Sequence, residues 1–272
     1  MGSLYVIGTP IGNLDDITIR ALKILNDVDI IIAEDTRTAK KLLNKYDINK
    51  PLISFHKESS ENKLNKIISG LNTYTYALIS EAGTPVVSDP GMDLIYHAGE
   101  LGFPIVVIPG ASSVTGAMSI SGMNGDRFFF LGFLPRRSKE RLLDLNGIKN
   151  VKETLVFFES PHRLLRSLMD MKTILGDRRI AVCREMTKIH EEVFRGPISQ
   201  AILYFEKPRG EFCLVVEGNL HSEINTVEDP QWIMQELRLL KGLGKSGRDS
   251  VRIVSDISGI NKRELYKIWI QI

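Results

Sequence analysis

Short apolar runs rich in β-branched residues alternate along the first half of the chain with longer segments that repeat apolar residues every three or four positions. Runs of the first kind are typical of buried strands, and segments of the second kind are typical of helices that bury one face. This alternation predicts a mostly parallel sheet with helices on both faces. The expected strands are Leu4–Ile7, Val28–Ala33, Leu52–Phe55, Tyr76–Ser80 and Ile105–Ile108, and the expected helices are Ile17–Leu25, Arg37–Lys45, Glu61–Leu71 and Met92–Gly102.

A second series with the same two patterns follows residues 116–126, a stretch rich in Gly, Ser and Met. It predicts a mixed α/β core with strands at Phe128–Leu131, Thr154–Phe158, Ile180–Arg184, Glu191–Arg195 and Phe212–Glu217 and helices at Leu164–Leu175 and Ile198–Phe205. Three further helical patterns lie around Trp232–Leu240, Ser250–Ile257 and Arg263–Ile270. The chain is thus expected to have an N-terminal parallel-sheet α/β domain (1–115), a second mixed α/β domain (116–220) and a basic helical C-terminal region (221–272).

The composition is that of an ordinary soluble globular protein, with 43% hydrophobic and 25% charged residues. Its 272 residues are enough for two cores. The net charge is only +2, but residues 231–272 hold eight Lys and Arg against four Asp and Glu, which leaves −2 for the rest. We therefore expect any contact with nucleic acid to involve this basic tail.

The two cysteines, Cys183 and Cys213, each lie inside an apolar run and form no CxxC pair. They are interpreted as buried thiols in a reducing compartment. The histidines lack metal-ligand spacing, so no metal site is expected. No run approaches the roughly 20 apolar residues of a membrane span, and the N-terminal segment lacks the pattern of a signal peptide. These features predict a cytoplasmic protein without a membrane partner.

Polar loops with glycine or other small residues follow four of the five strands expected in the first sheet. Ligands bind at the edge where the carboxyl ends of parallel strands meet, so these loops are expected to lie together. The segment SEAGTPVVSDPG at 80–91 combines a glycine that permits close backbone approach with two prolines that stiffen the path, which suits a small cofactor. The other three loops are GTPIGN at 8–13, EDTR at 34–37 and PGASS at 109–113, the last opening a helix whose first amides can bind a carboxylate.

Two of these loops also have purely structural interpretations. Gly8 and Gly12 are four residues apart and Pro10 removes a backbone donor, so their loop is no dinucleotide fingerprint and would serve equally well as a turn between strand and helix. Asp35 or the next residue can simply cap the helix that follows. Glu34, at a strand's carboxyl end near an arginine, is instead placed for polar recognition.

Seven motifs, taken in order, resemble the loops of the tetrapyrrole methylase superfamily of S-adenosylmethionine-dependent methyltransferases. They are GTPIGNL, AEDTR, SEAGTPVVSDPG, PGASS, GFLPR, FFESPHR and CREMTK. Within that superfamily the chain is similar to the bacterial ribosomal RNA small subunit methyltransferase I family, over about residues 3 to 219 and into the tail. The resemblance implies a homodimer of chains with two α/β domains, and S-adenosylmethionine bound between the domains. The implied reaction methylates a cytidine ribose 2′-hydroxyl in the decoding region of 16S rRNA, within the small ribosomal subunit.

The same resemblance implies which residues hold the cofactor. The wider superfamily tends to have Gly-Asp-Pro where this chain has Gly83-Thr84-Pro85. Asp89 or Glu81 is therefore expected to replace the missing carboxylate, and a porphyrin or corrin substrate is disfavoured. The residues expected at the cofactor are Gly8, Pro10, Gly83, Thr84, Val87, Asp89, Ser112 and Ser113.

Methyl transfer to a hydroxyl needs an aligned nucleophile and is assisted by a general base. The candidate bases are Glu81, Asp35 and Lys188, and the sequence does not choose among them. Cations would neutralise RNA phosphates, and the segment 134–141 supplies four of them, with a solvated helix face as the alternative interpretation. The residues expected to bind substrate are Arg37, Arg136, Arg137, Arg163 and Arg184.

Two other functions stay open at this point, a small-molecule tetrapyrrole methylase and a nucleic-acid-binding regulator. The segment 249–270 resembles a helix-turn-helix, and alone it would suit a DNA reader. A regulator has no use for four polar loops at one sheet edge, however, and a tetrapyrrole enzyme has little use for a basic tail. The RNA ribose methyltransferase is the favoured prediction.

Overall fold

The computed structural model describes residues 2–56, 58–220 and 230–272, and the chain divides into two compact units. Unit 1 comprises Met1–Lys149 and Glu153–Gly218, and unit 2 comprises Asn150–Lys152 and Asn219–Ile272. Both predicted α/β cores lie in unit 1, and the predicted helical region lies in unit 2. The boundary at residue 115 stays a prediction, and the start of the predicted tail, residues 221–229, lies outside the described residues.

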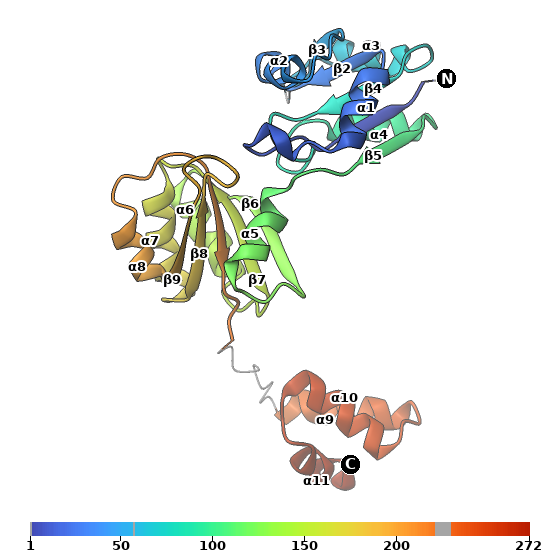
Figure 1. Cartoon of the computed structure of the whole chain (residues 1–272). Coiled ribbons are helices and arrows are strands. Elements are labelled where there is room, and N and C mark those ends of the chain that lie inside the picture. The colour runs from blue at the N-terminus through green and yellow to red at the C-terminus, as the bar shows by residue number, and fades with distance from the viewer. Residues whose placement is uncertain (1, 57, 221–229) are drawn as a thin grey trace. The chain divides into compact units, whose positions relative to one another are not determined.

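Unit 1 begins with a five-stranded sheet in which all strands are parallel, in the order β3-β2-β4-β1-β5 (Figure 1). Ile7, Ile79 and Ile108 lie level with one another at the carboxyl ends of their strands. The strands are β1 (Leu4–Ile7), β2 (Ile30–Ala33), β3 (Leu52–Ser54), β4 (Tyr76–Ile79) and β5 (Ile105–Ile108). The helices are α1 (Ile19–Asp27), α2 (Thr36–Lys45), α3 (Glu61–Gly70) and α4 (Met92–Glu100), and a 3-10 helix, Leu14–Asp16, precedes α1.

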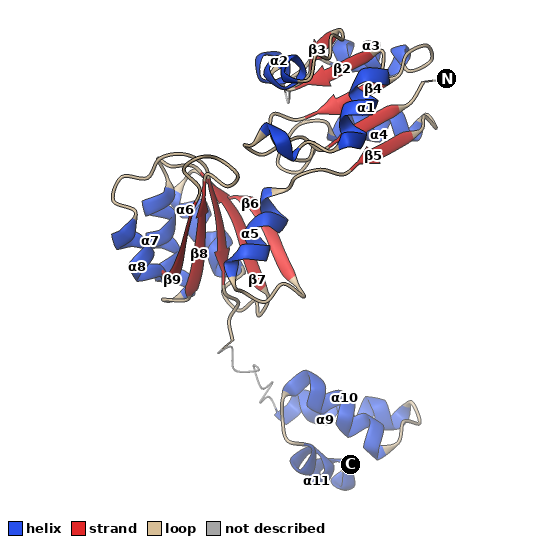
Figure 2. Cartoon of the chain, viewed as in Figure 1, coloured by secondary structure: helices blue, strands red, loops and turns tan. Residues whose placement is uncertain are grey.

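Both faces of this sheet are buried under helices (Figure 2). Successive residues of a strand point to opposite faces. Ile31 and Ile79 accordingly belong to a core shared with α1 and α2, whereas Ile32 and Leu78 belong to a core shared with α3 and α4. Burial on both faces explains why the strands have continuous apolar sequences. The predicted parallel sheet with helices on both sides is confirmed.

The second sheet of unit 1 is mixed, in the order β6-β7-β10-β8-β9. Only β6 and β7 are parallel, and the other neighbouring strands are antiparallel. Val156, Cys183 and Val215 pack against one helix, α5, so their neighbours in each strand face the opposite side. The strands are β6 (Phe128–Phe133), β7 (Thr154–Glu159), β8 (Arg179–Arg184), β9 (Glu192–Pro197) and β10 (Phe212–Val216), and the helices are α5 (Ser113–Ser121), α6 (Ser138–Gly147), α7 (Leu164–Leu175) and α8 (Ile198–Tyr204).

Three segments differ from the sequence-based expectation. The stretch 116–126 is helical as far as Ser121, because Ala117 and Met118 pack on the second sheet. Residues 138–147 form α6, whose Arg141 is buried and donates from Nε to Asp170 at 2.7 Å. Helix α1 begins two residues later than predicted, because the Thr18 hydroxyl accepts the Ala21 amide and caps it.

The described part of unit 2 contains three helices, α9 (Pro230–Gly242), α10 (Gly247–Ser258) and α11 (Lys262–Gln271), which confirms the three predicted helical patterns. They share their own core, in which Leu237, Val254 and Leu265 are almost completely buried. Within the three described ranges, no helix has the length and apolar character needed to cross a membrane.

Candidate active site

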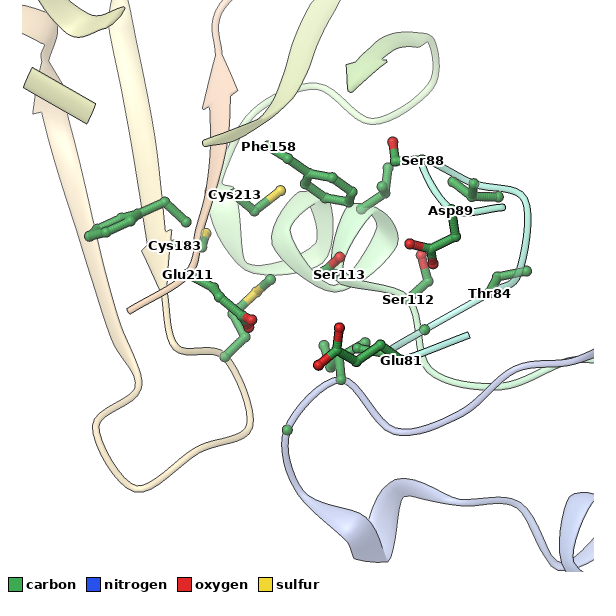
Figure 3. A pocket seen from close by; sticks show the side chains of 18 of the residues that line it. Glu81, Thr84, Ser88, Asp89, Ser112, Ser113, Phe158, Cys183, Glu211 and Cys213 are labelled. Carbon is green, nitrogen blue, oxygen red and sulfur yellow. The ribbon is translucent and has the colours of Figure 1, made fainter. Parts of the chain in front are cut away.

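A cavity of about 580 Å³ lies in unit 1, where loops of the first sheet meet residues of the second (Figure 3). The first sheet contributes the loops that follow β1, β4 and β5, and the second contributes the ends of β6, β7, β8 and β10. Three of the four loops singled out in the sequence thus line one space, and the loop after β2 contributes only Thr38 from the following helix.

The loop after β4 is tied to the loop after β1 by backbone and side-chain hydrogen bonds. The Thr9 amide donates to the Gly83 carbonyl at 2.8 Å, and the Gly83 amide donates back to the Thr9 carbonyl at 3.1 Å. The Ser80 hydroxyl donates to the same Gly83 carbonyl at 3.2 Å. These bonds hold the backbone of residues 80–83 in one position at the cavity wall.

The same loop stores backbone strain. Gly83 has φ of 75° and Gly91 has φ of 126°, values that glycine adopts readily. Val86 and Ser88 also have positive φ, at 75° and 67°, which is uncommon for residues with a side chain and costs about 1–3 kcal/mol each. Strain of this kind is typical of ligand sites, where the surrounding structure imposes the conformation.

Glycines let three loops approach one another closely. A Cβ on Gly8 would lie 2.8 Å from the Gly110 amide nitrogen, so the turns after β1 and β5 pack backbone to backbone. A Cβ on Gly12 would lie 2.7 Å from the Thr187 hydroxyl, in the loop after β8. That hydroxyl accepts the Asn13 amide at 2.9 Å, which joins the two α/β parts of unit 1 beside the cavity.

Of the residues expected at the cofactor, all but one line the cavity. Gly8 does not line it and instead allows the close packing on Gly110. The lining residues among those predicted are Pro10, Gly83, Thr84, Val87, Asp89, Ser112 and Ser113.

Asp89 and Glu81 are the carboxylates that this loop presents to the cavity, and Figure 3 shows both directed toward the open space. Burial raises the pKa of Asp89 to about 6, and the negative charge of Glu34 adds to the effect. Glu34 lies outside the lining, and its own pKa is raised by burial and then by Glu81. Negative charge at Glu34 and Glu81 thus acts in the same direction as burial on the pKa of Asp89.

The other two candidate bases have their side chains engaged. Asp35 does not line the cavity, because its carboxylate caps α2 by accepting the Arg37 amide at 2.8 Å and also binds the Arg37 guanidinium. Lys188 lines the cavity, and its Nζ donates to Glu185 at 2.9 Å and to Glu211 at 2.8 Å. Partial burial acts to lower the pKa of Lys188, but these hydrogen bonds raise it overall, so the amine carries a proton at neutral pH.

None of the five arginines expected to bind substrate lines the cavity. Arg163 donates to the Leu134 and Pro135 carbonyls and lies 3.4 Å from Glu159, which places it as a support for the loop after β6. Arg184 donates to the Arg209 carbonyl and to Glu192. Of these five arginines, Arg37, Arg136 and Arg137 are exposed.

Several lining residues from the second sheet were missed by the sequence-based prediction. Glu159 and Cys183 lie within motifs singled out in the sequence, but neither was assigned to the site. Glu211 and Cys213 follow a short loop that carried no signal. The two cysteines are free and buried as predicted, and burial raises the pKa of Cys183 to about 11 and that of Cys213 still further, so both stay protonated.

The cavity has an acidic character. Its charged lining consists of four carboxylates and the ammonium group of Lys188. The buried negative charge of Glu159 is stabilised by hydrogen bonds that its carboxylate accepts from the Ser160 amide and the Ser167 hydroxyl. The arrangement favours a ligand with positive charge and apolar faces, since Phe133, Phe158 and Met186 also line the space. Within the described part of the chain, no three His, Cys, Asp or Glu side chains form a group that could hold a metal ion.

Comparison with known proteins shows which family and which known fold this chain is similar to. A family model described as Tetrapyrrole (Corrin/Porphyrin) Methylases matches residues 3–202. A crystal structure of diphthine synthase superimposes with a TM-score of 0.66 over 80% of this chain and 90% of that one, at 13% sequence identity, which shows a shared fold.

Two curated relatives carry the name Ribosomal RNA small subunit methyltransferase I. The protein from Halalkalibacterium halodurans is 42% identical, covering 99% of this chain and 95% of the relative. The protein from Thermotoga maritima is 49% identical, covering 99% of the relative but 80% of this chain, so about a fifth of this chain has no counterpart in it. The chain therefore belongs to the ribosomal RNA small subunit methyltransferase I family, within the tetrapyrrole methylases.

Proposed function

We propose that this protein transfers a methyl group from S-adenosylmethionine to the ribose 2′-hydroxyl of a cytidine in the decoding region of 16S rRNA. The observation that carries the proposal is the stiff, acidic cavity between the two sheets of unit 1, in a chain that belongs to a family of ribosomal RNA methyltransferases. The small-molecule tetrapyrrole methylases are related at the level of the superfamily, whereas the rRNA methyltransferases are related over almost the whole chain.

The residues of the cavity fit the cofactor in size and charge. A volume of about 580 Å³ lies within the range of small-molecule sites, roughly 300–1,000 Å³. S-adenosylmethionine carries a sulfonium, an ammonium and a carboxylate group, and therefore a net positive charge, which complements the acidic lining. We assign Asp89 to a positive or hydroxyl group of the cofactor, the amides around Ser112 and Ser113 to its carboxylate, and Phe133 and Phe158 to its apolar faces.

When bound, the cofactor supplies an activated methyl group, and the task of the protein is to hold a ribose hydroxyl in line with it. The hydrogen bonds between Thr9 and Gly83 fix the backbone of the cavity wall, so that it does not move when the substrate binds. Glu81 is the candidate base that fits this task best, because it lines the cavity, is exposed, and, among the described residues, accepts a side-chain hydrogen bond from the Thr38 hydroxyl alone, at 3.4 Å. Asp35 is engaged as a helix cap, and Lys188 is protonated and bonded to Glu185 and Glu211, so neither is free to accept the hydroxyl proton.

We further propose that the protein acts as a homodimer. The edge strands β5 and β6 expose apolar side chains outside the cavity lining, with Val107 61% exposed and Phe129 49% exposed. Exposed apolar edges of this kind mark protein contacts. Light scattering on the purified chain tests the proposal, and a mass of one chain at micromolar concentration would contradict it.

Transfer of labelled methyl from S-adenosylmethionine tests the proposed reaction. The acceptors are small ribosomal subunits from cells that lack this gene, free 16S rRNA and a porphyrinogen. We expect label at one cytidine ribose of 16S rRNA, mapped by mass spectrometry of nuclease fragments, and none in the porphyrinogen. Label on a base, or on the porphyrinogen alone, would overturn the assignment.

Replacing both Arg136 and Arg137 with Gln is expected to weaken RNA binding without changing cofactor affinity. Both side chains are exposed beside the end of β6 and lie outside the cavity lining. Each lost contact with a single-strand phosphate lowers the slope of log affinity against log salt by about 0.7. Salt titration of RNA binding measures the slope, and an unchanged slope would assign this segment to a solvated helix face.

A chain that ends at Asn219 is expected to keep its fold and its cofactor affinity, because none of the described residues beyond Cys213 lines the cavity. It keeps the hydrogen bond from the Asn219 amide to the Val151 carbonyl, at 2.7 Å. We expect about tenfold weaker capture of RNA, since the removed helices carry positive charge. Thermal unfolding, calorimetry and methyl transfer at limiting RNA measure the three properties. A large fall in melting temperature would instead mean that unit 2 stabilises unit 1.

A further inference from the structure

Helices α10 and α11 of unit 2 enclose a second, open cavity of about 360 Å³. Its walls are the first turns of the two helices. Gly259, with φ of 71°, ends α10, and the Asn261 side chain accepts the Arg263 amide at 2.9 Å and caps α11, so the two helices are joined by a short turn. The cavity is lined by Arg248, Val251, Lys262, Arg263 and Tyr266.

The three cations of this groove are exposed, and the structure gives none of them an ion pair with any described residue. Arg252, one turn away on α10, differs in lying 3.6 Å from Asp249. Positive side chains in the first turn of a helix also oppose its macrodipole, so Lys262 and Arg263 contribute nothing favourable to α11 by their charge. Three cations without an ion pair to any described residue thus gather at the N-termini of two helices, where the macrodipole adds further positive charge.

Binding an anion by charge alone would require only the cations, but the groove also has an aromatic ring and an apolar floor. Tyr266 lines it and is 47% exposed, and Val251 forms a buried apolar floor. Exposed aromatic rings beside basic side chains are how proteins bind single-stranded nucleic acid, with the ring stacking on a base and the cations contacting phosphates. A short anionic peptide would use the cations but not the ring.

We propose that this groove binds single-stranded RNA, with Arg248, Lys262 and Arg263 on successive phosphates and Tyr266 stacked on a base. The choice of RNA over DNA rests on the proposed function, whereas the phosphate contacts and the stacking do not. The groove adds affinity for a large substrate: its residues belong to unit 2, whereas the described residues that line the cavity of about 580 Å³ belong to unit 1.

The test uses the full-length chain and two double variants with the same change in charge. Lys262→Gln with Arg263→Gln removes two cations of the groove. Arg238→Gln with Lys245→Gln removes two exposed cations of unit 2 that do not line it. Tyr266→Leu removes the ring alone. The probes are a single-stranded fragment of 16S rRNA, the same sequence as a DNA strand, and a DNA duplex, each titrated against salt by fluorescence anisotropy.

We expect the groove variant to bind the RNA fragment about tenfold more weakly than the wild type at 150 mM salt, with a salt slope lower by about 1.4, and the control variant to change both much less. Tyr266→Leu is expected to weaken RNA binding about fivefold without changing the slope. Equal effects of the two double variants, or none from either, would overturn the proposal, and so would tighter binding of the DNA duplex than of RNA. Circular dichroism verifies that each variant keeps its helices.

Methyl transfer separates this inference from the proposed function. If the wild type binds RNA through the groove but methylates no rRNA, the proposed function is refuted and the RNA-binding role of the groove is supported. If the groove variant methylates saturating RNA at the wild-type rate and binds it with wild-type affinity, the RNA-binding role of the groove is refuted and the proposed function is supported.

Discussion

Replacing Gly83 with Val is expected to lower affinity for S-adenosylmethionine about a hundredfold. Valine in this backbone conformation would be strained by roughly 2–3 kcal/mol, and the loop would relieve the strain by moving the cavity wall away from the cofactor. Gly83 has φ of 75°, which a β-branched residue avoids. Space is not the obstacle, since a Cβ there would lie 3.5 Å from Ile11, an ordinary contact. We expect the backbone to turn away instead and to lose both backbone hydrogen bonds with Thr9. Calorimetry with S-adenosylmethionine measures the loss.

Gly102 offers a matched control for this substitution. Its φ is 74°, no atom lies within 4 Å of a Cβ built there, and it follows α4 outside the cavity lining. Gly102→Val should therefore lower the melting temperature by a similar amount and leave cofactor affinity unchanged. Wild-type affinity in Gly83→Val, or an equal loss of affinity in both variants, would remove the loop after β4 from the cofactor site.

Asp89→Asn is expected to weaken cofactor binding about ten- to hundredfold at pH 7.5, the worth of a charge-assisted hydrogen bond in a partly buried site. The pKa of Asp89 is raised to about 6, so the carboxylate form that balances a positive ligand becomes populated as the pH rises through 6. Wild-type affinity should accordingly increase between pH 5 and pH 7. The affinity of Asp89→Asn should change much less over this range. Calorimetry at several pH values measures both, with Asp93→Asn on the exposed side of α4 as the control.

The same variant is expected to make the cofactor-free protein more stable at pH 7. The pKa of Asp89 rises from 3.8 in the unfolded chain to about 6 in the folded one, so the folded chain alone holds the proton between these values. The contribution of Asp89 to the free energy of unfolding therefore falls as the pH rises through this window and stays low above it. Removing the charge should raise the free energy of unfolding at pH 7 by roughly 1–2 kcal/mol, after allowance for the part of the side chain that water reaches. A less stable Asp89→Asn protein at pH 7 would contradict this account.

The sequence predicted the strands of both sheets because each is short, apolar and buried on at least one face. Boundaries shifted by up to three residues, for example where the side chains of Thr18 and Ser246 cap the starts of α1 and α10. Helix α5 was harder to delimit, because the small residues around Gly116 are typical of a loop as well as of a helix packed closely on a sheet. Packing of Met118 on the second sheet decided between them.

Local chemistry also predicted most of the first-sheet side of the cavity. A glycine between polar residues at a strand's carboxyl end, as at Gly83, indicates a ligand loop from its position alone. Glu211 carried no comparable signal, because its contact with Lys188 joins residues 23 positions apart through the pairing of β8 with β10. The hydrogen-bond partners of Arg163 and Arg184 could not be predicted from the sequence either. The sequence therefore did not reveal that both guanidinium groups already bind other groups of the protein.

The sequence by itself therefore determined the two α/β cores, the three tail helices and the loops that meet at one sheet edge, because hydrophobic period and glycine position act over a few residues. Only the tertiary structure decided which charged groups remain free to act. In the folded chain Asp35 caps a helix, the Lys188 ammonium is paired with a carboxylate, and Arg141 forms a buried ion pair. Glu81 and Asp89, by contrast, face the cavity. The physical reason is that the availability and pKa of a side chain depend on burial and on partners brought together by folding, which no local pattern encodes.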